Sequence, residues 1–172
     1  MKATSRPTSV FHRMPRGVLA LVALLSLAAV GSALVSQHVF GMLPCPWCIF
    51  QRVLYLVIAI VALAGWLAGA RPVTLLTTLG VLALALGGIA SAVFQHQVAA
   101  RDSSCAFTLA DRFLNATGLE TAVPWLFQVT ATCMEAASYR LLGLPFEIWS
   151  GLLFTLIAAA SLLLLWHWKA RA

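Results

Sequence analysis

Long apolar stretches alternate with polar breaks along this chain, and the pattern occurs four times. An apolar stretch of about 20 residues is long enough to cross a bilayer as a helix. The four stretches cover residues 18–35, 47–68, 73–94 and 146–168, the last interrupted near its start by Glu147. Lipid cannot satisfy backbone polar groups, so spanning segments of this length must be helical. The pattern predicts an all-α integral membrane protein, a four-transmembrane-helix bundle.

The breaks between these stretches differ in length and character. Residues 37–46 form a short connection, and residues 69–72, with the sequence Gly-Ala-Arg-Pro, form a tight turn. Residues 95–144 are too mixed in character to cross lipid. We therefore expect residues 1–172 to form a single membrane domain with one long loop.

Composition excludes a water-soluble class, because 62% of the residues are hydrophobic, only 9% are charged, and mean hydropathy is +0.95. Positive residues concentrate on the side that four spans would leave in the cytoplasm. They are Lys2, Arg6, Arg13, Arg16, Arg71, Lys169 and Arg171. Both termini should be cytoplasmic, with residues 37–46 and 95–144 periplasmic. The net charge of +6 is then a topology signal and indicates no nucleic-acid partner.

The first apolar stretch could instead be a cleaved signal peptide. It follows a basic leader and contains the small residues Gly31-Ser32-Ala33. Apolar character resumes at Leu34 and Val35, however, and the run is long for a signal core. We expect it to be retained as an anchor, and both interpretations place residue 37 onward outside the cytoplasm.

All four cysteines fall on the predicted outer side, which suggests disulfide chemistry. Cys45-Pro46-Trp47-Cys48 opens the second apolar stretch, and Pro46 suits the first helical position. Cys45 would then be the N-cap, with Cys48 in the first turn, where the helix dipole favours the thiolate. Arg52 follows one turn later on the same face, and an arginine inside an apolar segment is usually functional. The arrangement favours redox work.

Other interpretations of these residues remain open. A C-x-x-C pair can be half of a zinc site, although no second such pair occurs and the spacing argues against a metal. The pair could also be a structural disulfide, and Arg52 could simply extend to the headgroups. Cys105 and Cys133 could staple the long loop. If both pairs react, electrons can pass between them by thiol–disulfide exchange.

Several aromatic and histidine residues flank the predicted site. His38 and His96 each lie near an outer helix end, as candidates for ligand contacts or proton relays, although interfacial histidines are often neither. Trp47, next to the thiol pair, could line a ligand site or belong to an aromatic belt. The apolar run 123–127 could lie on the membrane surface and hold the loop near the first cysteine pair.

The chain resembles the bacterial disulfide bond formation protein B (DsbB) family over residues 17–168. The resemblance rests on Gln37-His38-Val39, on residues 44–52, on Val123-Pro124 leading to Cys133, and on Leu142-Gly143-Leu144. It departs from the family pattern at Gln51, where some members carry an acidic residue, at Tyr139, and around Pro145-Phe146-Glu147.

The resemblance implies an inner-membrane enzyme that reoxidises a periplasmic DsbA-type thiol oxidase and reduces ubiquinone or menaquinone. It implies that Cys105 forms the mixed disulfide with the partner, that Cys133 completes the loop pair, and that Cys45 exchanges with that pair. Cys48 would then face the quinone with Arg52 beside it. Trp47, His38 and His96 are further candidates for quinone contacts. Because the partner is soluble, the loop pair should be the more exposed one.

Two other functions stay open at this point. The same architecture could serve one dedicated periplasmic substrate, or the protein could be a non-enzymatic membrane protein with structural disulfides. A catalytic pair must cycle between redox states, whereas structural disulfides stay oxidised. Rapid acid trapping followed by alkylation would therefore separate the last class from the other two.

The charge asymmetry yields a first prediction, about topology. A periplasm-dependent reporter fused within residues 110–120 should be active, and the same reporter fused after Arg71 should be inactive, because short basic loops stay in the cytoplasm. A cytoplasm-dependent reporter at both positions serves as the control and should give the opposite pattern. Activity of one reporter at both positions would contradict four spans.

Overall fold

The computed structural model describes residues 9–101 and 105–169. The expected cytoplasmic charges Lys2, Arg6 and Arg171 lie outside the described residues, as do the side chains of Arg13 and Lys169.

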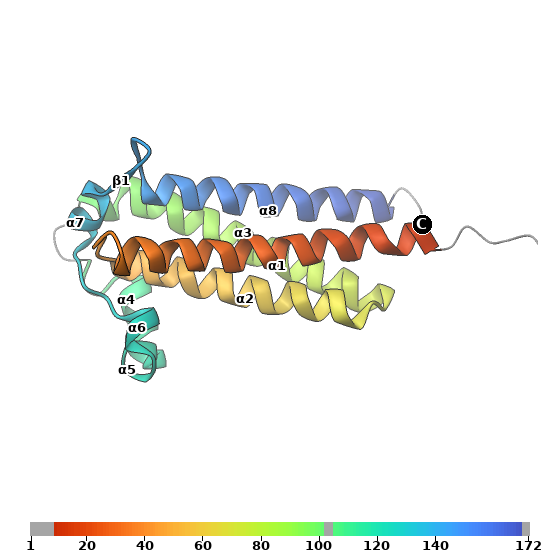
Figure 1. Ribbon diagram of the computed structural model, residues 1–172, viewed down its shortest axis with the longest axis horizontal. Helices are drawn as coiled ribbons and strands as arrows, with labels where there is room; N and C mark the ends of the chain where they lie inside the picture. The colour runs from red at the N-terminus through yellow and green to blue at the C-terminus, as the bar shows by residue number, and fades with distance from the viewer. Residues whose placement is uncertain (1–8, 102–104, 170–172) are drawn as a thin grey trace, which may run out of the picture.

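Four long helices form the body of the protein (Figure 1): α1 (Ser9–His38), α2 (Pro46–Ala68), α3 (Arg71–Gln97) and α8 (Phe146–Lys169). Each is long and apolar enough to cross a membrane. The predicted class, an all-α membrane bundle with four spans, is therefore confirmed. Helix α3 runs three residues past the expected end at residue 94, so Gln95 and His96 are helical and do not belong to the loop.

The four helices lie side by side along the long axis of the molecule (Figure 1). Helix α2 packs against α1 and α3, and α8 packs against α3, while α1 and α8 contact each other much less. The start of α1 and the end of α8 lie at the same end of the bundle (Figure 1). The long segment between α3 and α8 lies at the opposite end, which we call the cysteine end because it carries all four cysteines.

Small residues let the helices approach closely in the middle of the bundle. Ala62 of α2 and Ala85 of α3 are fully buried, and the rings of Tyr55 and Phe154 stack with centroids 4.1 Å apart. Gly88 of α3 lies directly against the Phe154 ring of α8, where a Cβ atom would overlap it. Without a hydrophobic force between helices in lipid, such close contacts supply much of the packing energy.

Short elements fold over the cysteine end. They are η1 (Ala99–Arg101), α4 (Leu109–Thr117), α5 (Leu119–Ala122), α6 (Pro124–Phe127), α7 (Cys133–Ser138), β1 (Arg140–Leu141) and β2 (Leu144–Pro145). Helix α4 packs on α2, and α7 packs on η1. Helices α5 and α6 project to one side of the bundle (Figure 1). The segment expected to be only a polar loop therefore has secondary structure of its own.

The two strands form a small antiparallel hairpin just before α8. Arg140 pairs with Pro145 and Leu141 pairs with Leu144. The two residues between the strands, Leu142 and Gly143, have φ values of 53° and 85°. Positive φ at both central residues is what a tight two-residue hairpin turn requires. The hairpin leads directly into α8.

Adjacent glycines on α3 allow a matched test of the packing. Gly88→Ala should lower the melting temperature of the detergent-solubilised protein by several degrees, because its Cβ atom overlaps the Phe154 ring. Gly87→Ala has open space around it and should leave the melting temperature unchanged or raise it slightly. Equal effects of the two substitutions would contradict this account of the α3–α8 contact.

Candidate active site

The C-x-x-C pair occupies the N-terminus of α2, as predicted. Cys45 is the N-cap, with extended backbone (φ −90°, ψ 170°), and Pro46 follows in the first turn. The backbone N–H of Cys48 donates to Cys45 Sγ at 3.4 Å, and the two sulfur atoms lie 3.0 Å apart as free thiols. Such a separation is close enough for a disulfide to form with a small movement.

Cys45 is the more protected thiol of the pair. It is fully buried, whereas Cys48 is partly exposed. The hydrogen bond to Cys48 Sγ and the burial both raise the pKa of the Cys45 thiol well above its ordinary value. Cys48 is therefore the thiol of the pair that a reagent can reach.

Gln95 of α3 holds both sulfur atoms in place, and the sequence analysis did not identify it. Its Nε2 atom lies 3.3 Å from Cys48 Sγ and 3.6 Å from Cys45 Sγ. Its Oε1 atom accepts a hydrogen bond of 2.8 Å from Gln51 Nε2. Gln95 is 2% exposed. The sequence offered one hint of this role, a glutamine one residue beyond a predicted span. Gln95 becomes buried only because α3 extends further than expected.

The loop cysteines Cys105 and Cys133 form a disulfide, with their Cα atoms 5.7 Å apart. Both are fully buried, so the expectation that the loop pair is the more exposed one was wrong. Small residues cover the disulfide from several sides: Ala99, Ala110 and Ala136 belong to the same cluster. Residues with so little side chain let the surrounding short helices close tightly over the sulfur atoms.

All four cysteines belong to one hydrophobic cluster at the cysteine end. Trp47 is part of it, 5% exposed, with its ring 4.8 Å from Phe94 and 5.9 Å from Phe50. The indole Nε1 atom has no hydrogen-bond partner. The structure therefore brings the C-x-x-C thiols and the loop disulfide together, as thiol–disulfide exchange between them requires.

Arg52 is buried inside the protein. Its side chain is 4% exposed, donates to Gln37 Oε1 at 3.1 Å, and donates a short hydrogen bond to the Leu126 carbonyl of α6. The open interpretation that Arg52 extends to the headgroups therefore does not hold. The Nε atom remains without a partner. Burying a guanidinium is costly, so an unpaired N–H on it indicates a site for an acceptor.

The segment expected to lie on the membrane surface forms α6 and docks on the bundle. Phe127 is buried beside Ile49 of α2, whereas Trp125 is 61% exposed. His38 Nε2 lies 3.0 Å from the Trp125 carbonyl, which can only accept, so this nitrogen donates. Together with the bond from Arg52, these contacts hold α6 near the C-x-x-C pair. Contact of Trp125 with a membrane stays a prediction.

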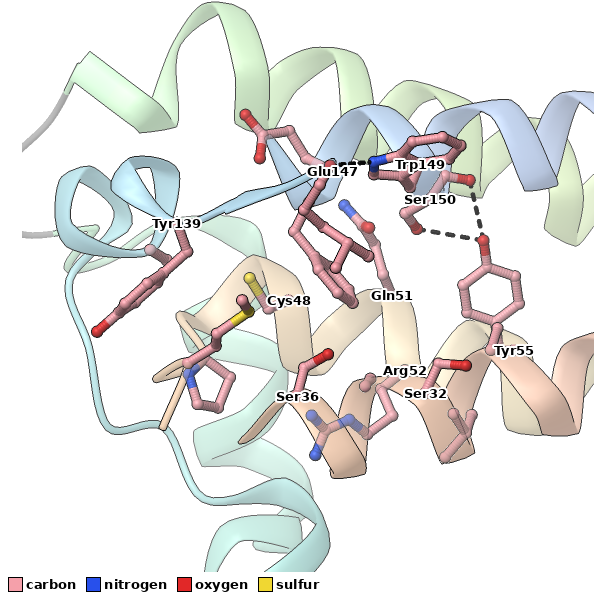
Figure 2. A pocket seen from close by; sticks show the side chains of 18 of the residues that line it. Ser32, Ser36, Cys48, Gln51, Arg52, Tyr55, Tyr139, Glu147, Trp149 and Ser150 are labelled. Atoms are coloured by element: carbon pink, nitrogen blue, oxygen red, sulfur yellow. Dashed lines mark hydrogen bonds between the residues drawn. The ribbon is translucent and has the colours of Figure 1, made fainter. Parts of the chain in front are cut away.

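A cavity of about 330 Å³ lies between the helices at the cysteine end. Helices α1, α2 and α8 supply most of its lining, which is largely apolar and includes Val30, Ala33, Leu43, Phe146 and Leu153. Figure 2 shows Cys48, Arg52 and Tyr55 following one another along α2, with Ser150 of α8 across from Tyr55. Cys48 thus faces the cavity on one side and touches the cysteine cluster on the other.

The cavity brings together only some of the residues predicted to contact a quinone. Cys48 and Arg52 line it, whereas Trp47, His38 and His96 are not among the lining residues. His96 lies at the end of α3, where its Nδ1 atom is 3.0 Å from Glu147 Oε1. Contacts of these three residues with a quinone stay predictions.

The fold and the site define a class: a multi-pass membrane protein in which a pair of thiols lies between a buried disulfide and a cavity within the helices. The family model described as "Disulfide bond formation protein DsbB" matches residues 15–164. The chain therefore belongs to the DsbB family, which confirms the resemblance seen in its sequence.

Individual relatives agree with this assignment. Disulfide bond formation protein B 1 of Pseudomonas savastanoi pv. phaseolicola is 37% identical over 152 residues, covering 87% of this chain and 89% of that protein. Disulfide bond formation protein B of a Polaromonas species is 35% identical over 168 residues, covering 90% and 93%. The Dechloromonas aromatica protein of the same name is 37% identical over 149 residues, covering 81% and 84%.

The contacts of Gln95 yield a prediction about thiol reactivity. Gln95→Leu should slow alkylation of Cys48 by roughly tenfold, because an N–H donor to sulfur stabilises the thiolate that reacts. The rate is measured with a labelled maleimide on the reduced protein. Gln97→Leu, at an exposed position two residues on, is the control and should react like wild type. An unchanged rate in Gln95→Leu would show that the amide does not influence Cys48.

Proposed function

We propose that this protein is a quinone-dependent thiol:disulfide oxidoreductase of the bacterial inner membrane that reoxidises a periplasmic DsbA-type dithiol oxidase. One observation carries the proposal: Cys48 belongs to the cluster that contains the loop disulfide and also lines the cavity within the bundle. A thiol in that position can receive electrons from one side and release them on the other.

Electrons would pass inward through two exchanges. A thiolate of the reduced partner attacks the Cys105–Cys133 disulfide at Cys105 and forms a mixed disulfide, and the partner's second thiol resolves it, leaving both loop cysteines reduced. The reduced loop pair then attacks the oxidised Cys45–Cys48 pair, which becomes a dithiol. Each exchange moves two electrons, so the disulfide is passed outward to the partner. The shared cluster supports this order.

The residues around the cavity fit a quinone. Most of the lining is apolar, which suits an isoprenoid-bearing ring. Two residues that line the cavity each have one buried polar atom without a hydrogen-bond partner in the protein: Arg52 Nε and Glu147 Oε2. Arg52 would donate to a ring oxygen and stabilise negative charge there as electrons arrive. When bound, a quinone supplies a two-electron, two-proton acceptor.

Orientation follows from the charge distribution. The cysteine end would face the periplasm, and the opposite end, which carries Arg16 and Arg71, would face the cytoplasm. Arg16 Nε donates to the Trp66 carbonyl in the last turn of α2. A positive charge at this C-terminal end also interacts favourably with the helix dipole. Placing the loop disulfide in the periplasm gives a soluble thiol oxidase direct access to that side.

The position of Cys48 between the loop disulfide and the cavity argues against a purely structural role for the cysteines. A dedicated substrate in place of a DsbA-type partner would use the same chemistry.

The function is tested by supplying the purified protein with a reduced DsbA-type protein and a soluble quinone. Quinone absorbance should fall by one equivalent for each disulfide formed in the partner. Ubiquinone and menaquinone analogues are compared in parallel. Failure to reduce either quinone with any DsbA-type donor, in protein that retains its four thiols after chemical reduction, would refute the proposal.

The roles within the loop pair yield a prediction. Cys133→Ala should accumulate a covalent complex with a partner variant that keeps only its attacking cysteine, because Cys105, oxidised by exchange with the Cys45–Cys48 pair, forms the mixed disulfide and neither a second partner thiol nor Cys133 remains to resolve it. The complex is detected on a non-reducing gel and should disappear on reduction. Cys105→Ala is the matched control, and an equal yield of complex from it would mean that the two roles are reversed.

Arg52→Gln gives a prediction about the quinone side. The variant should insert in the membrane and form the partner mixed disulfide, while its KM for quinone rises and its reoxidation slows by about 10²-fold, since one charge-stabilising donor is lost. Arg52→Lys should be milder, because it keeps the charge but loses the planar fork. Arg112→Gln, at an exposed arginine of α4, is the control. Wild-type quinone kinetics in Arg52→Gln would remove Arg52 from the site.

A further inference from the structure

Glu147 is an acid in an unusual place. It is the second residue of α8, lies within a segment apolar enough to cross a membrane, and is 2% exposed. Ionisable groups in such segments are costly, and they commonly mark routes for protons or ions. No role assigned so far to the cysteines or to Arg52 uses this carboxyl group.

The two carboxyl oxygens of Glu147 have different surroundings. Oε1 lies 3.0 Å from His96 Nδ1, whereas Oε2 is buried and has no hydrogen-bond partner. The His96 side chain is 49% exposed, and that of Glu147 is 1% exposed. The pair therefore connects the surface at the end of α3 with a buried oxygen atom. Figure 2 shows Glu147 at the start of α8.

Glu147 is also the only carboxyl group among the described residues that line the cavity. Cys48 lines the same cavity. The titratable or charged side chains on the elements packed around Glu147 are His96 of α3, Cys48, Arg52 and Tyr55 of α2, and Tyr139 ahead of β1. Tyr55 is occupied, because its hydroxyl donates to the Ser150 carbonyl.

We propose that Glu147 delivers a proton to the oxygen that is reduced in the cavity, and that His96 replaces this proton from water at the cysteine end. The inference rests on the proposed function. A buried carboxyl group can hold and release a proton where water is excluded, and an imidazole with one exposed edge can exchange protons with solvent.

The protons and electrons balance. Oxidation of the Cys45 and Cys48 thiols to a disulfide releases two electrons and two protons. The two electrons and one thiol proton pass to the acceptor in the cavity, and the other thiol proton is released to water. The second proton comes from Glu147, whose O–H bond breaks as a new O–H bond forms on the reduced oxygen. His96 then gives its Nδ1 proton to Glu147 and takes another from water at Nε2.

A purely structural role is the alternative, since the His96–Glu147 contact also ties α3 to α8. The two roles differ in what they affect. A lost structural tie would lower stability and disturb quinone binding. A lost proton donor would slow the reduction step and leave binding unchanged.

The test compares Glu147→Gln with Glu120→Gln, the same change at a partly exposed position on α5. Glu147→Gln should lower kcat for quinone reduction by about 10²-fold with KM within about twofold, as expected when a general acid is removed. Thiol–disulfide exchange with the reduced partner, measured without quinone, should match wild type. Glu147→Asp should restore part of the rate, and Glu120→Gln should behave as wild type.

A second readout needs no quinone. Acidified protein is moved into D₂O, and the carboxyl band that Glu147→Gln lacks is followed by infrared spectroscopy. In wild type this band should shift rapidly, because His96 connects it to solvent. In His96→Phe the shift should be at least roughly tenfold slower, since the exchanging imidazole is gone.

The outcomes separate the two proposals. If wild type does not reduce quinone, the proposed function fails, while the infrared experiment still tests the proton path. If wild type is active and Glu147→Gln keeps its kcat, the inference is overturned. If Glu147→Gln does not accumulate in the membrane, His96→Gln at the half-exposed position takes its place. Wild-type kcat in that variant, or equal D₂O exchange in His96→Phe, overturns the inference equally.

Discussion

The absence of water inside a bilayer is the constraint on which this structure depends. Every polar group at membrane depth must find a partner within the protein, because lipid offers none. Gln95 and Gln51 meet this requirement by binding each other, and Gln95 uses its remaining N–H groups on the two C-x-x-C sulfur atoms. The chemistry of the thiols therefore rests on the same hydrogen bonds that allow polar side chains to lie between α2 and α3.

The few polar atoms that escape this rule are the informative ones. Ser26 Oγ, Trp47 Nε1, Arg52 Nε and Glu147 Oε2 are the buried side-chain atoms without partners among the described residues, and of these four residues Arg52 and Glu147 line the same cavity. An unpartnered buried N–H or carboxyl oxygen costs on the order of 1–3 kcal/mol, more when the group is charged. Under the proposed function, the ligand beside Cys48 would supply a hydrogen-bond acceptor for Arg52 Nε and an oxygen atom that can take a proton from Glu147.

Much of this architecture could be predicted from the order of residues, because it depends on local rules. The four spans follow from the length of the apolar runs, and the N-cap at Cys45 follows from the proline after it. The buried positions of Gln95 and Glu147 could not be predicted, since each depends on where a helix ends relative to its neighbours. The burial of Cys105 and Cys133 depends in the same way on how the short helices close over them.

The burial of the loop disulfide changes how access to it must work. Cys105 has φ 50°, a left-handed conformation that costs a non-glycine residue of order 1 kcal/mol or more. Phe107, two residues on, has φ 62° and is 86% exposed. Under the proposed function, a partner that rearranges this short stretch would relieve the left-handed turn while uncovering sulfur, so the backbone would supply part of the energy for opening. The C-x-x-C pair belongs to the same cluster as this disulfide, and Gln95 holds both of its sulfur atoms.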